Sequence, residues 1–121
     1  MLRVVIESPL KGNFERNRRY ALWCAYHCRT LGEAAYASHL FYTQFLDDRI
    51  PEERAFGIAA GLAWAEAGDV RAFYTDLGWS DGMTKAKEKM PPESMFAERT
   101  LPPEMFERFA AGEYPAVTPG F

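Results

Sequence analysis

The stretch Tyr74-Thr-Asp-Leu-Gly-Trp-Ser-Asp-Gly-Met83 indicates how this chain folds. It ends an apolar, β-prone run that starts at Val70, turns through Asp76 and Gly78, and enters a helix behind Ser80. Open α/β sheets build ligand sites from this succession of strand end, turn and helix start. Free backbone N–H groups and the positive end of the helix dipole meet there. We therefore expect a ligand site at this point of the chain.

The segments on either side alternate between strand and helix patterns. The consecutive β-branched residues from Val4 to Ile6 are typical of a strand buried on both faces. Strands are predicted at 3–8, 34–40, 70–74 and 94–101, the last at an edge, and helices at 14–31, 51–67, 81–89 and 104–111. Because parallel strands need a crossover between them, this order predicts a three-layer α/β/α domain with a flavodoxin-like (Rossmann-like) parallel sheet of about four strands. The domain is expected to span 1–111, followed by a Pro/Gly-rich tail at 112–121.

The helix predicted from Pro51 has acidic residues in its first turn to meet the helix dipole. We expect one face of small and aromatic residues to lie on the sheet; it comprises Phe56, Ala60, Ala63, Trp64 and Ala67. Gly57 and Gly61 suggest a close approach to another backbone. Trp23 and Trp64, at helical core spacing, are predicted to be core residues.

Composition and charge exclude several classes of protein. The 121 residues suffice for one domain, and a net charge of −3 argues against a surface that coats nucleic acid. No apolar run reaches the roughly 20 residues of a membrane span, and no signal peptide pattern precedes the first strand, so a cytoplasmic location is expected. Cys24 and Cys28 are predicted to be reduced and partly buried. No metal is expected, because these cysteines and His27 lie on one helix and do not converge on a tetrahedral point.

The carboxyl ends of parallel strands meet at one edge of a sheet, and several polar residues fall there. Ser8 and Pro9 are predicted to meet Ser38, His39 and the 74–80 stretch, with the 41–50 connection above. Each side chain allows two interpretations. Ser80 caps its own helix or contacts a ligand, and Asp76 forms the turn or serves as a functional carboxylate. His39 is a packed, hydrogen-bonded residue or an acid or ligand contact.

Aromatic residues near the same edge suit a planar ligand. Tyr42, Tyr74 and Trp79 could stack on a nucleobase, although aromatic side chains also simply fill cores. The chain has no Walker loop, no complete G-x-G-x-x-G, no G-x-S-x-G and no H-E-x-x-H. Dinucleotide oxidoreduction, classical NTP hydrolysis and serine esterase chemistry are therefore unsupported, and no cofactor is expected.

These residues make the chain resemble a family of small bacterial and phage proteins that are themselves similar to the nucleoside 2-deoxyribosyltransferases. The resemblance extends to about Leu101 and rests on Val4–Pro9, Ala37–Leu40, Pro51–Ala55, Gly57-Ile58, Gly61–Trp64, Tyr74–Gly78, Ser80 and Gly82-Met83. It implies a flavodoxin-like domain, a site over the strand ends and a homo-oligomer. The transferases use a glutamate near the start of the helix behind Ser80 to attack the anomeric carbon of a deoxynucleoside, which forms a glycosyl-enzyme.

The chain departs from that pattern at the nucleophile. The positions where the transferases and their relatives have the glutamate are Thr84 and Ala86 here. Glu88 is the only glutamate on the helix, and at ~1.5 Å per residue it lies about 9 Å along the axis from Gly82. Asp76 is the first candidate for a catalytic carboxylate and Glu88 the second.

We therefore expect a protein that binds a nucleoside or nucleotide, with any reaction at an N-glycosidic bond. The alternatives are a non-enzymatic protein that sequesters a nucleotide-derived signal, and an interaction protein that uses the tail from Gly112. Ligand contacts are expected from Ser8, Pro9, Ser38, His39, Tyr42, Tyr74, Gly78, Ser80, Gly82 and Met83.

Overall fold

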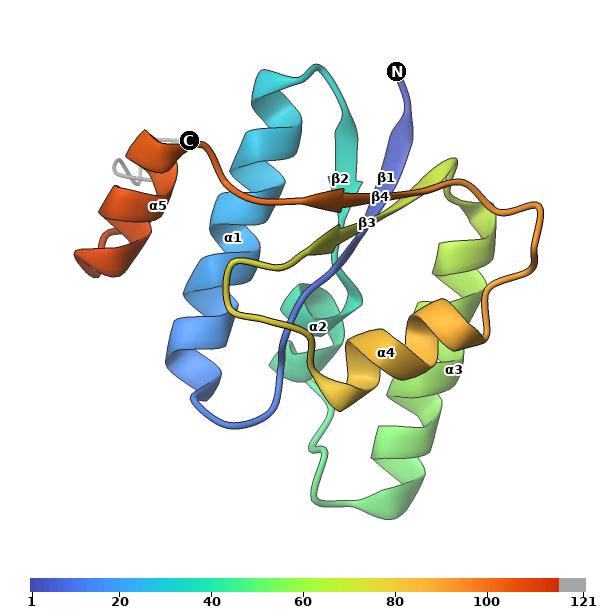
Figure 1. Ribbon diagram of the computed structural model, residues 1–121. Helices are drawn as coiled ribbons and strands as arrows, with labels where there is room; N and C mark the ends of the chain where they lie inside the picture. Colours follow the sequence, from blue (N-terminus) through green and yellow to red (C-terminus); the bar gives the residue numbers. More distant parts are fainter. Residues whose placement is uncertain (116–121) are drawn as a thin grey trace.

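A single sheet of four parallel strands forms the centre of the computed structural model, which describes residues 1–115 (Figure 1). The strands are β1 (Arg3–Glu7), β2 (Ala34–Tyr36), β3 (Val70–Tyr74) and β4 (Phe96–Arg99). Their order in the sheet is β2-β1-β3-β4, as in the first four strands of the flavodoxin-like arrangement. The predicted α/β fold with a parallel sheet is confirmed, and β4 lies at an edge as expected.

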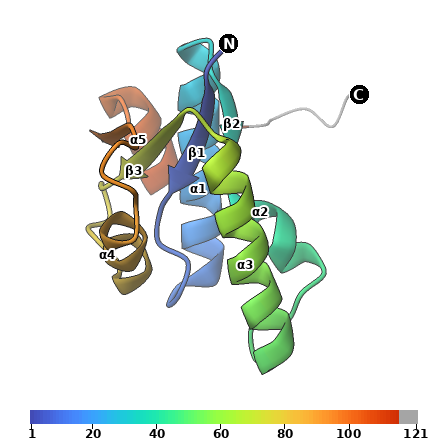
Figure 2. The ribbon, with the colours of Figure 1, turned by 90° about the vertical axis from the view of Figure 1, so that its right-hand side faces the viewer.

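Helices cover both faces of this sheet. They are α1 (Phe14–Thr30), α2 (Ser38–Phe41), α3 (Pro51–Ala67), α4 (Asp81–Glu88) and α5 (Pro103–Ala110), with a 3₁₀ turn η1 (Tyr42–Gln44). α1 and α5 lie on one side of the sheet and α3 and α4 on the other, and Figure 2 shows α3 in front of β1 with α1 behind it. Most of the predicted tail lies outside the described residues. Within residues 1–115, no helix has the length and apolar character needed to cross a membrane.

Local sequence signals set the helix starts. The side chain of Asn13 accepts a hydrogen bond from the backbone N–H of Arg16 (3.0 Å) at the start of α1. Ser80 does the same for Met83 (3.2 Å) at the start of α4. Both contacts satisfy an N–H group that the helix cannot pair internally. α3 instead begins with Pro51, whose missing N–H is no loss at that position.

The main core lies between the sheet and α1. Val4, Ile6, Ala72 and Tyr74 project from the strands onto fully buried side chains of α1, among them Tyr20, Trp23, Cys24 and Cys28. The core position of Trp23 is thus confirmed, and both cysteines are free and buried. The run Val4 to Ile6 is buried along its whole length, as a central strand covered on both faces requires.

The packing of α3 corrects two expectations. Trp64 is 55% exposed rather than buried, and Phe56 is also exposed. The side of α3 that packs inward carries Gly57, Gly61 and Ala65 instead, and the two glycines approach side chains of Leu46 and Ser38 rather than another backbone. When the middle of a helix is apolar on every side, hydrophobic periodicity does not indicate which side packs inward. In α3 the side with the smallest residues packs against the rest of the domain.

The second strand is shorter than predicted. β2 pairs with β1 only as far as Tyr36, and Ser38 and His39 belong to α2. An edge strand has hydrogen-bonding partners on one side only, so helical bonds readily replace its ladder. Here Leu40 N–H donates to the carbonyl of Ala37 (3.0 Å). The consequence is that the His39 side chain turns toward the end of β1.

Candidate functional site

The first region of interest lies where the connections of two adjacent strands diverge. The chain leaves β1 through α1 toward β2, and it leaves β3 through α4 toward β4, on the opposite side of the sheet. Open α/β sheets bind ligands at such a switch point, outside the carboxyl ends of the strands. Ser8 and Pro9 follow β1, and the turn through Gly78 to Ser80 follows β3.

Ser8 and His39 meet at this edge, as the topology predicts. The Ser8 hydroxyl and His39 Nε2 are 3.0 Å apart, and Ser8 is buried. Burial lowers the pKa of His39 to about 4, so the imidazole is neutral at pH 7. His39 is therefore a packed, hydrogen-bonded histidine that joins α2 to the end of β1.

The carboxylate of Asp76 is held by the protein itself. Tyr20 Oη donates to it at 2.5 Å, and the backbone N–H of Leu101 donates at 3.0 Å. The backbone N–H of Asp76 donates in turn to Tyr20 Oη (3.0 Å). These bonds tie the turn after β3 to α1 and to the chain that leaves β4. The geometry is that of a turn former whose carboxylate accepts hydrogen bonds from Tyr20 and Leu101.

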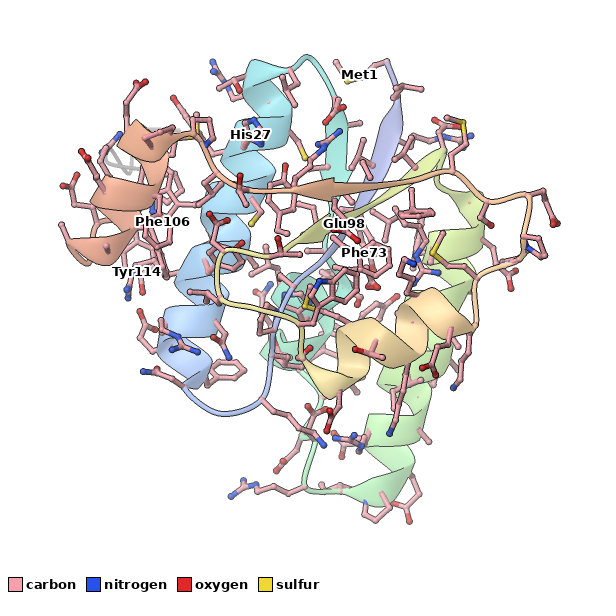
Figure 3. All side chains as sticks on the ribbon, in the orientation of Figure 1. Met1, His27, Phe73, Glu98, Phe106 and Tyr114 are labelled. Atoms are coloured by element: carbon pink, nitrogen blue, oxygen red, sulfur yellow. The ribbon has the colours of Figure 1, made fainter. Side chains whose placement is uncertain are left out.

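Glu88 faces a different part of the molecule. With Trp79, Thr84, Lys87 and Glu98 it lines an open hollow of about 400 Å³ between α4 and β4. The Trp79 ring stacks on Phe73, with ring centroids 5.1 Å apart and planes inclined by 25°. Figure 3 shows Phe73 and Glu98 on adjacent strands next to α4. Asp76 is absent from this lining, so the two predicted catalytic carboxylates do not share a site.

The remaining predicted ligand residues divide between buried and accessible positions. The Tyr74 ring is buried toward α1, where its hydroxyl contacts His27 Nδ1 (2.9 Å) and accepts from Arg99 (3.2 Å). Met83 is also buried, and Tyr42 accepts a hydrogen bond from Trp64 Nε1 at 3.0 Å.

Gly78 and Gly82, between β3 and the first turn of α4, have different structural roles. Gly78 adopts φ = +87°, which favours glycine in the turn after β3. At Gly82, the described atom nearest to where a Cβ would stand is Ser80 Oγ, at 3.9 Å. A ligand therefore has room to approach the backbone at the start of α4.

Comparison with known proteins identifies the family. A family described as a domain of unknown function (DUF7768) matches residues 2–98. The chain belongs to this family. The DUF7768 match includes Ser8, His39 and every residue that lines the hollow, whereas α5 follows it. No curated protein and no solved structure matches the chain.

The sheet also contains a partly buried ion pair that the sequence did not single out. Arg71 forms an ion pair with Glu7 at 3.0 Å, with 13% and 20% of the two side chains exposed. Burial raises the pKa of Glu7 and the charge of Arg71 opposes that rise. The sequence did contain a signal for this pair, because Glu7 and Arg71 are charged residues within the apolar runs 3–7 and 70–74. A charged side chain in a buried strand usually needs a partner of opposite charge. Among residues 1–115, no three His, Cys, Asp or Glu side chains gather to hold a metal ion.

Proposed function

We propose that the protein binds a nucleoside or nucleotide in the hollow between α4 and β4 and leaves it intact. The observation that supports this most is the Trp79 ring, which is 40% exposed and is backed by Phe73. An aromatic plane held from behind and open in front suits stacking on a nucleobase. The hollow of about 400 Å³ falls within the ~300–1,000 Å³ range of small-molecule sites.

The charges around the hollow favour an uncharged nucleoside over its phosphates. Glu88 and Glu98 place two carboxylates against the single ammonium of Lys87. Lys87 Nζ also lies 4.8 Å from the centre of the Phe96 ring and makes a cation–π contact with it, so this ammonium is partly engaged. Carboxylates accept hydrogen bonds from sugar hydroxyls and repel phosphate.

Binding without turnover fits the groups available for chemistry. Asp76 already accepts hydrogen bonds from Tyr20 and Leu101, so it is not free to attack a sugar. Thr84, which stands where the transferases have their nucleophilic glutamate, lines the hollow with a hydroxyl, which is a weaker nucleophile than a carboxylate at neutral pH. These residues support a non-enzymatic protein that binds or sequesters a nucleoside-derived compound.

The second candidate is cleavage or transfer at an N-glycosidic bond. It is favoured by the pair Glu88 and Glu98, because glycosidic chemistry uses two carboxyl groups that face one sugar. In that case Glu88 would replace Asp76 as the first catalytic candidate. We also propose that the protein forms a homo-oligomer, as the resemblance to the transferases implies.

Calorimetry and chromatography on the same samples distinguish these functions. The common nucleosides and their 5′-monophosphates are titrated into the protein, and the mixtures are then analysed for released base. We expect binding of a nucleoside, weaker binding of its monophosphate and no free base. Trp79→Ala should weaken binding by roughly 5- to 150-fold, since a stacked base contributes about 1–3 kcal/mol. Phe14→Ala, which removes an exposed aromatic side chain from α1, is the control and should leave affinity unchanged.

Each result discriminates between the candidates. Free base that disappears in Glu88→Gln would establish the second candidate. Binding that survives in Trp79→Ala would place the ligand elsewhere. Absence of binding by any nucleoside or nucleotide would refute both candidates and leave an interaction protein.

A further inference from the structure

The outer surface of α3 is apolar where a surface helix is normally polar. Residues 55–65 include no charged residue, and neither do residues 34–46, which form β2, α2 and η1. The two segments are packed together, since Trp64 Nε1 donates to Tyr42 Oη (3.0 Å) and the Trp64 ring contacts that of Tyr36 (5.5 Å). Figure 2 shows α2 beside α3 along one side of the molecule.

Large side chains stand out from this surface. Phe41, Phe45, Phe56, Ile58, Leu62 and Trp64 are each between 39% and 60% exposed. We call this set, with the alanines between its members on α3, the α3 face. A surface helix that is apolar on both sides is expected only where both sides are covered. The inner side of α3 is covered by its own chain, so the α3 face requires another cover.

We propose that the α3 face is the contact between two copies of this chain, related by a two-fold axis that passes near Ala59. The area, charge and shape of the face support this contact, and they do so independently of any nucleoside binding.

The area is sufficient for a dimer. Taking about 150–250 Å² for a whole large side chain, the six residues expose roughly 600 Å². That is at the upper limit of about 300–600 Å² for the largest apolar patch of an ordinary monomer. It is also about three quarters of the ~800 Å² that each partner contributes to a standard interface. The alanines of α3 and the rim of the face add to this.

Charge selects a second copy as the partner. In a two-fold contact the same surface meets itself, so any charge near the axis faces its own copy and is repelled. The α3 face has no charge and meets that condition, although the whole chain has a net charge of −3. A strongly charged partner would find no complementary group in residues 55–65.

The shape of α3 suits a helix pair. Ala55, Ala59 and Ala63 recur every four residues and are all exposed, so they form one ridge. At 3.6 residues per turn, Leu62 lies on one flank of this ridge and Phe56 on the other. Small residues along the line of contact let two such helices approach, with ridges of four-residue spacing crossing at about −50°. The ends then diverge, which separates the acidic residues near each end of α3 from their copies.

Light scattering of the full chain tests this directly. At tens of micromolar concentration we expect a mass twice the 13.8 kDa of one chain. Ala59→Arg should convert the protein to a monomer and weaken association at least 100-fold, because it buries two like charges at the axis. Ala110→Arg introduces the same group at an exposed alanine of α5 and should remain a dimer. Circular dichroism of both variants verifies that they fold.

A cross-link gives a second readout, which reports the surface at which the two copies meet. Ala59→Cys should form a disulfide-linked dimer under mild oxidation, whereas Ala110→Cys should not, and the native Cys24 and Cys28 are buried. A wild-type chain that stays monomeric would overturn the proposal and leave the face to a different protein. A folded Ala59→Arg variant that is still dimeric would equally overturn it.

Discussion

The His39 imidazole is partly buried and lies against the Ser8 hydroxyl, and this affects stability below neutral pH. The unfolded chain binds a proton on His39 near the ordinary pKa of about 6.5, whereas burial lowers the folded pKa to about 4. Between these values the unfolded state holds more protons. The free energy of unfolding should therefore fall by up to about 1.4 kcal/mol per pH unit as pH decreases from 6.5 to 4.

Urea unfolding at several pH values measures this slope. His39→Gln keeps a polar side chain near Ser8 but cannot titrate in this range. It should be less stable than the wild type at pH 7, and its stability should change less between pH 6.5 and 4. Equal slopes in the two proteins would show that His39 does not cause the acid sensitivity.

The pair of Glu33 and Arg99 makes a separate prediction at lower pH. Two contacts of 2.8 Å join the guanidinium to the carboxylate, and both side chains are largely buried. These hydrogen bonds hold the pKa of Glu33 below its ordinary value. Their contribution is present above the ordinary pKa of about 4.3 and is lost as pH falls through the lower, folded pKa.

Removing this carboxylate leaves Arg99 buried without its partner. Glu33→Gln should lower the free energy of unfolding at pH 7 by about 3 kcal/mol, measured by chemical denaturation. Asp47→Asn provides the control, since Asp47 pairs with Arg49 in solvent and its loss should change stability little. A Glu33→Gln variant as stable as the control would mean that the buried pair is energetically neutral.

At the scale of elements, two glycines make opposite predictions. A Cβ on Gly68, just after α3, would lie 2.5 Å from Val5 Cγ2 in the central strand. Gly68→Ala should therefore destabilise the protein by about 1–3 kcal/mol, because α3 must move away from the sheet. Gly82 lies in the first turn of α4, where the nearest described atom stands 3.9 Å from an added Cβ. Gly82→Ala should stabilise the fold by up to about 1 kcal/mol.

Thermal unfolding of the two variants provides the comparison. If Gly68→Ala were neutral, the packing between α3 and β1 would have to be loose enough to admit a methyl group. A second substitution tests the ligand site: Gly82→Val should weaken nucleoside binding while the domain stays folded. Unchanged affinity would remove the start of α4 from the site.

The helices also show where sequence patterns lose their power. In α1 charged residues mark the outer side, and its buried residues follow the apolar spacing. In α3 no charged residue occurs between Arg54 and Glu66, so the outward position of Trp64 could not be read from periodicity. The inward side of α3 is the side whose small residues allow the closest packing against the rest of the domain. This depends on the tertiary structure and not on the local sequence pattern.

For the whole molecule, alternation of β-branched and helical segments sufficed to predict a parallel sheet with helices on both faces. It also predicted that Ser8 and His39 meet, because the carboxyl ends of parallel strands share an edge. The separation of Asp76 from Glu88 was not predictable. It depends on the direction of the turn after β3. Tyr20, which is distant in sequence, donates a hydrogen bond to Asp76 and holds this carboxylate next to α1.

The position of β1 in the sheet has a consequence for synthesis of the chain. β1 is made first, yet its partner β3 begins only at Val70. At about 5–20 residues per second, a ribosome takes several seconds to supply that partner. During this interval Val4 to Ile6 can be sheltered on one edge only, by β2. Nascent chains that stop before Tyr74 should therefore be the ones that chaperones retain.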